Sequence, residues 1–189
     1  MELPFLSDED FFENCPPQTV CSVCGSNEIR PFMLVGDKYY WTCNVCKARI
    51  LSCKHWLSKE EEFKYYQTHQ NISSDPAYQE FAAQLALPIL DKLVPNSSGL
   101  DFGCGPDSAL SAILRQHGHN MTVYDPFFFP DEYSLIISYD FIVCSEAAEH
   151  FHQPAKEFKK FNSLLNENGW LGIICLLYTS DAADEGLGV

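Results

Sequence analysis

The glycine-rich turn at residues 99–106, Gly-Leu-Asp-Phe-Gly-Cys-Gly-Pro, constrains the fold of this chain more than any other segment. It follows one amphipathic helix pattern and opens another. The acid Asp101 stands two residues before Gly103, and Gly105 follows. Glycines at a strand end let the backbone turn sharply and approach a ligand without a side chain in between. The segment therefore predicts a site for a nucleotide-shaped cofactor.

A second acid is expected about 20 residues later, at the end of the next strand, where a carboxylate holds ribose hydroxyls. Asp125 meets this expectation because it directly follows the apolar segment 121–124. Hydrophobic periodicity predicts helices over 58–75, 77–93, 107–117 and 154–166, and strands over 99–102, 121–124, 135–137, 139–144 and 170–174. Strands that alternate with helices indicate an α/β fold, doubly wound around a mostly parallel sheet.

At Asp101, Gly103, Gly105 and Asp125 the chain resembles the class I S-adenosylmethionine (SAM)-dependent methyltransferases, whose domain is Rossmann-like. It departs from the family at Asp107, where the family has a third glycine. The NAD-binding pattern fails, because it needs a glycine at position 108 and this chain has serine. The alternative is a glycine-rich turn that binds no ligand. The residues that the resemblance assigns to SAM are Asp101, Gly103, Cys104, Gly105, Asp125, Pro126, Cys144 and Ser145.

The same resemblance implies that substrate contacts follow the strand over 139–144, where Glu146 and His150 are the predicted catalytic residues. Glu149 and His150 resemble the Glu-His pair that follows this strand in many small-molecule methyltransferases. A neutral imidazole titrates near working pH, so His150, or His152 as a second candidate, can act as a base. The alternative is a histidine at a helix start that hydrogen-bonds to the backbone.

Two Cys-x-x-Cys pairs, Cys21 with Cys24 and Cys43 with Cys46, are separated by 18 residues. Each pair aims two thiolates at one point, and two such turns close a tetrahedron around zinc. Residues 29–41 supply a hairpin between the pairs, so we expect a small zinc-ribbon-like module. Four cysteine ligands leave no open position, which makes this metal ion structural rather than catalytic. Four free thiols on a hairpin are the alternative.

The formal charge of −14 disfavours a polyanion as substrate, because nucleic-acid binding depends on Lys and Arg meeting phosphates. A small molecule is therefore the expected methyl acceptor. RNA is one alternative, and a non-catalytic zinc-ribbon adaptor for an unknown protein partner is another. An acidic N-terminus unlike a signal peptide favours the cytoplasm, where nine cysteines are not expected to form disulfides. No apolar run reaches the roughly 18 residues of a membrane span, so we expect no membrane contact.

The expected organisation has five parts. An acidic arm at 1–19 precedes the zinc-ribbon-like module at 20–55, and a helical linker or lid at 56–95 follows, which includes Tyr65, Tyr66 and His69. A partial SAM-binding methyltransferase domain at 96–174 and a tail at 175–189 complete the chain as given. Residues 175–185 match the translation of a transposase adapter used in sequencing libraries. We therefore expect this tail to be non-native and the class I sheet to stop at about its fifth strand. A genuine final strand with an acidic tail is the alternative.

Overall fold

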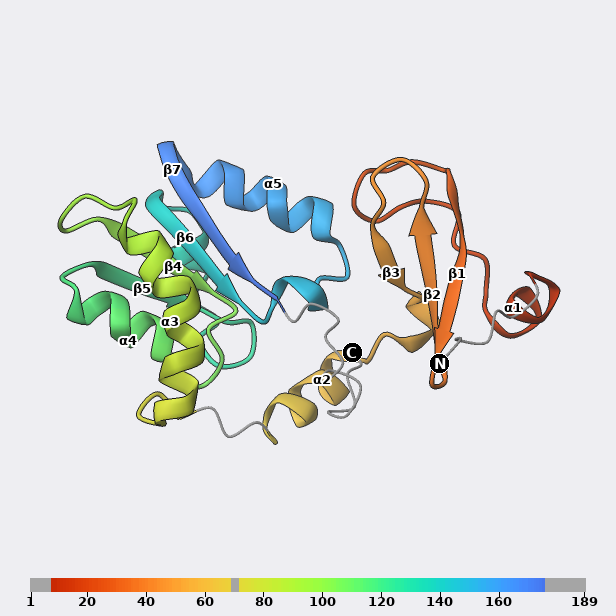
Figure 1. The fold of residues 1–189 in the computed structure, drawn as a ribbon, viewed down its shortest axis with the longest axis horizontal. Helices are drawn as coiled ribbons and strands as arrows, with labels where there is room; N and C mark the ends of the chain where they lie inside the picture. Colours follow the sequence, from red (N-terminus) through yellow and green to blue (C-terminus); the bar gives the residue numbers. More distant parts are fainter. Residues whose placement is uncertain (1–7, 69–71, 176–189) are drawn as a thin grey trace.

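The computed structural model describes residues 8–68 and 72–175, and Figure 1 shows that they form two modules side by side. The N-terminal module contains an antiparallel sheet, and the C-terminal module contains a parallel one. Helix α2 (Lys59–Tyr66) lies in the segment that connects them. No helix within the described ranges is long and apolar enough to cross a membrane.

The C-terminal module is built on four parallel strands, with the strand that leads into the glycine turn in an inner position. Their spatial order is β5 (Asn120–Tyr124), β4 (Ser98–Phe102), β6 (Tyr139–Ser145) and β7 (Leu165–Ile174). Because the strands are parallel, the carboxyl ends of β4, β5 and β6 meet at one edge of the sheet, where ligands bind in such folds.

Helices cover both faces of this sheet: α3 (Pro76–Leu90) and α4 (Ala109–Gln116) on one face and α5 (Pro154–Leu164) on the other, as Figure 1 shows. Successive residues of a strand point to opposite faces. Phe141 and Val143 of β6 therefore pack with α3 and α4, whereas Ile142 and Cys144 pack with α5. The predicted α/β class and the doubly wound parallel sheet are confirmed.

The N-terminal module has three antiparallel strands, β1 (Ile29–Val35), β2 (Lys38–Cys43) and β3 (Arg49–Leu51), and the first two form the expected hairpin. Helix α1 (Asp8–Asn14) occupies part of the segment that was expected to be an arm. Phe11 and Cys15 are buried, and the Phe11 ring lies 5.2 Å from that of Trp41. Part of the expected arm thus contributes to the core of this module.

The strand predicted over residues 135–137 is wrong. Leu135 ends the short 3-10 helix η2 (Glu132–Leu135), and Ile136 is 76% exposed. The Asp131 carboxylate accepts a hydrogen bond from the backbone N–H of Tyr133 at 3.0 Å and so caps η2. This local hydrogen bond competes with extended structure, and three apolar residues bury too little surface to outweigh it.

Two predicted helices are too long. The helix expected over 58–75 is α2 alone, which ends at Tyr66. The helix expected over 154–166 ends at Leu164, because Leu165 is extended and begins β7. The expected lid residue His69, the first seven residues of the expected arm, and the expected tail apart from Cys175 lie outside the described residues.

Candidate functional site

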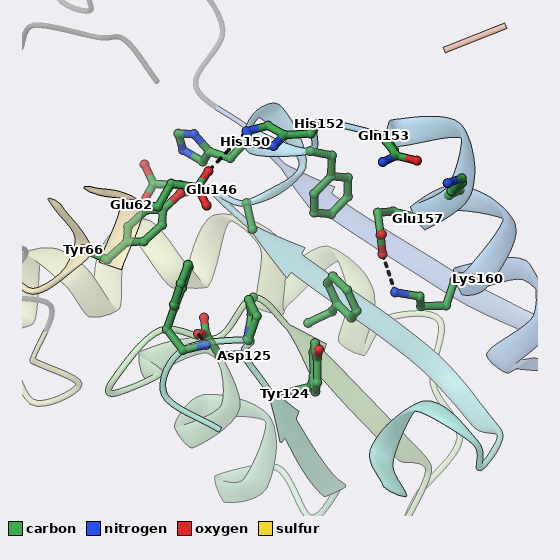
Figure 2. Close-up of a pocket in the computed structure, with 17 residues that line it drawn as sticks. Glu62, Tyr66, Tyr124, Asp125, Glu146, His150, His152, Gln153, Glu157 and Lys160 are labelled. Atoms are coloured by element: carbon green, nitrogen blue, oxygen red, sulfur yellow. Dashed lines mark hydrogen bonds and ion pairs between the residues drawn. The ribbon is translucent and has the colours of Figure 1, made fainter. Parts of the chain in front are cut away.

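A cavity of about 430 Å³ opens at the carboxyl ends of β4, β5 and β6, and Figure 2 shows the side chains around it. Small-molecule sites in proteins span roughly 300–1,000 Å³, so this volume suits a small ligand. Side chains from α2 and from α5 line it together with the strand ends. Of the predicted site residues, those that line the cavity are Gly103, Asp125, Pro126, Glu146, His150 and the second candidate base His152.

The glycine turn is shaped for close approach to this cavity. Gly103 and Gly105 have φ angles of +76° and +64°, a left-handed conformation that residues with a side chain rarely adopt. A Cβ atom on Gly103 would lie 2.5 Å from the Cβ of Ala147, which is too close. The backbone N–H groups of Gly103 and Cys104 both donate to the Tyr124 carbonyl, at 2.8 and 3.2 Å. These two bonds hold the turn against the end of β5.

Asp125 links the glycine turn to the loop that follows β5. One carboxylate oxygen, Oδ2, accepts the backbone N–H of Gly105 at 3.1 Å. The other, Oδ1, accepts the N–H groups of Phe127 and Phe128 at 2.8 and 3.1 Å. The residue is 7% exposed and lines the cavity. Asp125, which is predicted to bind ribose hydroxyls, therefore also holds the backbone of the glycine turn and of the loop that follows β5.

Asp101, the first acid of the motif, points away from the cavity. It is 1% exposed, and its Oδ2 accepts the hydroxyls of Ser108 at 2.5 Å and Ser111 at 2.7 Å. Burial raises the pKa of Asp101, and the two serine hydroxyls oppose that rise by stabilising the charged form. In this structure Asp101 holds the start of α4 beneath the glycine turn. Its side chain does not line the cavity.

The other predicted SAM ligands that do not line the cavity are Cys104, Gly105, Cys144 and Ser145. Cys104 and Cys144 are buried, and desolvation raises the pKa of both thiols well above the ordinary value. Raised pKa values leave both sulfurs protonated, so they behave as small apolar groups. Gly105 contributes through its backbone bond to Asp125.

Asp107, which replaces the family's third glycine, has a defined partner. Its Oδ2 accepts the backbone N–H of Ser73 at 2.7 Å. The Ser73 carbonyl in turn accepts the side-chain amide of Gln79 on α3 at 2.8 Å. The departure from the family pattern thus fastens the chain that enters α3 to the start of α4.

The two predicted catalytic residues lie on the rim of the cavity. Glu146 follows β6 directly and has a φ angle of +50°, which is unfavourable for a residue with a side chain. Its backbone N–H donates to the Ile174 carbonyl at 2.8 Å, which helps to hold this conformation. His150 ends the 3-10 helix η3 (Ala148–His150), and its ring lies 6.0 Å from that of Tyr66.

Sequence reasoning missed several lining residues because they come from other elements. Glu62 belongs to α2, and Lys156, Glu157 and Lys160 belong to α5. Glu157 and Lys160 form an ion pair of 2.7 Å. Tyr66 was expected only as a lid residue, and burial raises its pKa. A helix pattern in the sequence predicts that these segments are helical, but it does not predict which sheet edge they face.

The four paired cysteines form a candidate metal centre in the N-terminal module. Their sulfur atoms all lie within 4.8 Å of one another, with Cys21 to Cys46 at 3.7 Å and Cys24 to Cys43 at 3.6 Å. A tetrahedral zinc ion with sulfur ligands at about 2.3 Å sets neighbouring sulfurs about 3.8 Å apart. The predicted cluster is therefore confirmed as a set of ligands that can hold one metal ion. His55, a histidine of the same module, is not part of this cluster, because its ring nitrogen accepts the backbone N–H of Tyr39 at 3.2 Å.

The backbone of both cysteine turns explains this convergence. In the first turn the N–H of Gly25 donates to the Cys21 carbonyl at 2.9 Å, and Gly25 has a φ angle of +73°. In the second turn Lys47 has the equivalent place, with a φ angle of +64° and a bond of 3.0 Å to the Cys43 carbonyl. The hydrogen bond from the Cys46 N–H lowers the pKa of Cys43. At Cys46 the backbone bond from Ala48 acts in the same direction, but burial and the neighbouring thiols outweigh it and raise the pKa. Cys43 therefore forms the thiolate that metals bind more readily than Cys46 does.

Known proteins with similar structures are methyltransferases by name. The plantazolicin methyltransferase BpumL, in complex with a triazolic desmethylPZN analog and SAH, is 18% identical, with a TM-score of 0.38; the match covers 68% of this chain and 55% of that chain. A "possible histamine N-methyltransferase" from Thermotoga maritima is 15% identical, with a TM-score of 0.30 and coverage of 60% and 56%. The chain spans about half the length of these proteins.

The comparison with protein families is decisive. No protein of curated function matches the chain. The model of a family described as "Methyltransferase domain" matches residues 75–187, which is more than half of the 189 residues. The match includes α3, the glycine turn, Asp125 and the cavity edge of the sheet. On this evidence the chain belongs to the methyltransferase domain family.

Proposed function

We propose that the cavity at the carboxyl edge of the parallel sheet binds SAM and that the protein transfers its methyl group to a small molecule. The observation that carries this proposal is the pairing of the left-handed turn at Gly103 and Gly105 with the Asp125 carboxylate. Gly103 lines the cavity without a side chain of its own, so a ligand can approach its backbone there. A buried carboxylate beside it suits the hydroxyls of a ribose.

The chain's part in the reaction is to position and to desolvate. Bound SAM supplies a methyl group on a positively charged sulfur, which needs no further activation. Gly103 and Asp125 hold the donor, while Glu146 and His150, which also line the cavity, contact the acceptor. Aromatic side chains, among them Phe102, Tyr124 and Phe127, exclude water from the space between them. Asp101 acts in this proposal by holding α4 and the turn in place.

Charge and size support a small acceptor. The net charge of −14 repels a polyanion such as RNA, and the cavity holds a ligand of small-molecule size. We propose that the four cysteines bind a structural zinc ion. Cysteines arranged to bind a metal ion as thiolates suit a reducing compartment, which is why we propose the cytoplasm.

Calorimetric titration of S-adenosylhomocysteine (SAH) into the full chain tests the proposed cofactor site. Micromolar binding is expected, and Asp125→Asn should weaken it at least tenfold, about 1.4 kcal/mol, because an amide removes the negative charge beside the ribose. Asp91→Asn, which neutralises an exposed acid at the end of α3 outside the cavity, is the matched control and should bind normally. A folded protein that binds zinc but not SAH would favour the adaptor alternative.

A further inference from the structure

A histidine and a carboxylate from different parts of the chain meet at the cavity. His152 lies between η3 and α5, and its Nε2 is 3.3 Å from Oε1 of Glu62 on α2, the contact drawn as a dashed line in Figure 2. The imidazole is also stacked on the indole of Trp56, with ring centroids 4.4 Å apart and planes 2° from parallel. The ring of His152 is therefore held both in its plane and at one nitrogen.

The surroundings make this contact more than a surface ion pair. The side chains of Glu62 and His152 are 16% and 35% exposed, and both residues line the cavity. Burial raises the pKa of Glu62, and the attraction of His152 opposes that rise. Charges that are partly withdrawn from water are screened less by salt than exposed charges. Glu62 is thus placed to control both the orientation and the charge of the imidazole.

A contact between the two modules holds this arrangement in place. The backbone N–H of Ala155, at the start of α5, donates to the carbonyl of Ser22 in the first cysteine turn at 3.4 Å. Trp56 follows the N-terminal module directly, after the 3-10 helix η1 (Cys53–His55). The N-terminal module and the tryptophan that follows it therefore each contact the segment that carries His152.

The contact with Glu62 also selects a tautomer. A neutral imidazole has one N–H donor and one acceptor nitrogen, and a carboxylate can only accept. The Glu62 carboxylate 3.3 Å away therefore favours the hydrogen on Nε2, which leaves the lone pair on Nδ1. The other charged groups around the cavity are the carboxylates of Asp125 and Glu146, the exposed amine of Lys156, and the paired Glu157 and Lys160.

We infer that His152, oriented by Glu62 and Trp56, is the base that takes the proton from a hydroxyl-bearing methyl acceptor. This inference rests on the proposed methyl transfer. The acceptor oxygen uses an electron pair to form the bond to the methyl carbon, and the carbon–sulfur bond breaks with its pair leaving on sulfur. The hydroxyl proton moves to Nδ1 of His152. The products are the methyl ether, SAH and an imidazolium that Glu62 stabilises.

A hydroxyl acceptor is the class that needs such a group. A neutral amine attacks through its own lone pair and can lose a proton afterwards, whereas an un-ionised hydroxyl is a poor nucleophile. In this reaction His152 is a catalytic residue, and Glu62 and Trp56 are positioning residues. The predicted catalytic pair Glu146 and His150 lies on the same rim and contacts the acceptor without taking its proton.

Imidazole NMR on the full chain, saturated with zinc and labelled with ¹⁵N and ¹³C in its six histidines, tests the dyad without knowledge of the natural acceptor. His152→Gln identifies the His152 resonances. We expect the neutral Nε2–H tautomer at His152, and Glu62→Gln should lower the fraction of that tautomer, because a neutral amide accepts a hydrogen bond less strongly than a carboxylate. Glu60→Gln, an exposed residue on the same helix, is the matched control and should leave the tautomer ratio unchanged.

Phenol, used as a hydroxyl probe in the presence of SAH, tests the acceptor class. Phenol should shift the Nδ1 resonance of His152, and benzene, which has the same ring without the hydroxyl, should not. An Nδ1–H tautomer, equal effects of the two glutamate variants, or the same response to both probes would overturn the inference. SAH binding is measured separately, so loss of the proposed function would be distinguished from loss of the dyad.

Discussion

Replacing Gly103 by alanine should test whether a Cβ clash with Ala147 destabilises the turn beyond the cost of its left-handed φ angle. Alanine at a φ angle of +76° costs about 1–2 kcal/mol, because left-handed backbone crowds Cβ. The new Cβ would also lie 2.5 Å from Ala147, so the turn must move. That movement puts the two bonds to the Tyr124 carbonyl at risk, each worth about 0.5–1.5 kcal/mol. The expected loss in the free energy of unfolding is therefore about 2–5 kcal/mol.

Gly105→Ala is the matched control for this experiment. Gly105 has a similar φ angle of +64°, but a Cβ atom there would meet nothing within 4 Å. Only the backbone cost of about 1–2 kcal/mol should appear. Urea unfolding of zinc-saturated protein, followed by far-UV circular dichroism, measures both variants, and calorimetry with SAH measures the site. Gly103→Ala should also raise the Kd for SAH at least tenfold. Equal stability losses and equal SAH affinities in the two variants would refute the steric reasoning.

Two further predictions concern the metal and a carboxylate far from the cavity. Cys24→Ser should reduce bound zinc from one ion per chain to a small fraction, measured by mass spectrometry of the metal, and should alter the near-UV signal of the buried Trp41; full zinc occupancy in the variant would contradict the four-cysteine site. The Ser98 backbone N–H and then the Asn166 amide lower the pKa of Asp140, and each bond is 2.8 Å long. Because the folded pKa is below the unfolded one, this stabilisation is present above pH 3.8 and is lost as pH falls through the lower, folded value. Asp140→Ala should therefore cost about 1 kcal/mol at pH 7 and nothing in strong acid, and a difference from the wild type that persists in urea unfolding at pH 2 would be the contrary result.

Much of the fold was predictable because its signals are local. Alternating strand and helix patterns, the left-handed glycines and the cysteine spacing each depend on residues close together in the chain. The parallel sheet and the metal-ligand cluster follow from them. The strand expected over 135–137 was wrong for the opposite reason. A strand needs a hydrogen-bonded neighbour, and three apolar residues cannot show whether one is present.

The site was only partly predictable. Asp101 and Asp125 look equivalent in the sequence, since each is an acid at the end of a predicted strand. The structure separates them, because the Asp101 carboxylate faces two serine hydroxyls under the turn while Asp125 lines the cavity. Which face of a strand end meets solvent depends on the helix packed beneath it. That packing is a property of the whole module.

Two parts of this protein could therefore be predicted from local sequence patterns alone: a parallel α/β domain with a glycine turn, and a small hairpin with four metal ligands. Local backbone preferences and side-chain periodicity suffice for both. The set of side chains around the cavity depends instead on long-range packing. Glu62 and His152 are 3.3 Å apart in space, yet three of the four strands of the parallel sheet lie between them in the chain. Their contact depends on how α2 and α5 pack at one sheet edge, and no local pattern encodes that geometry.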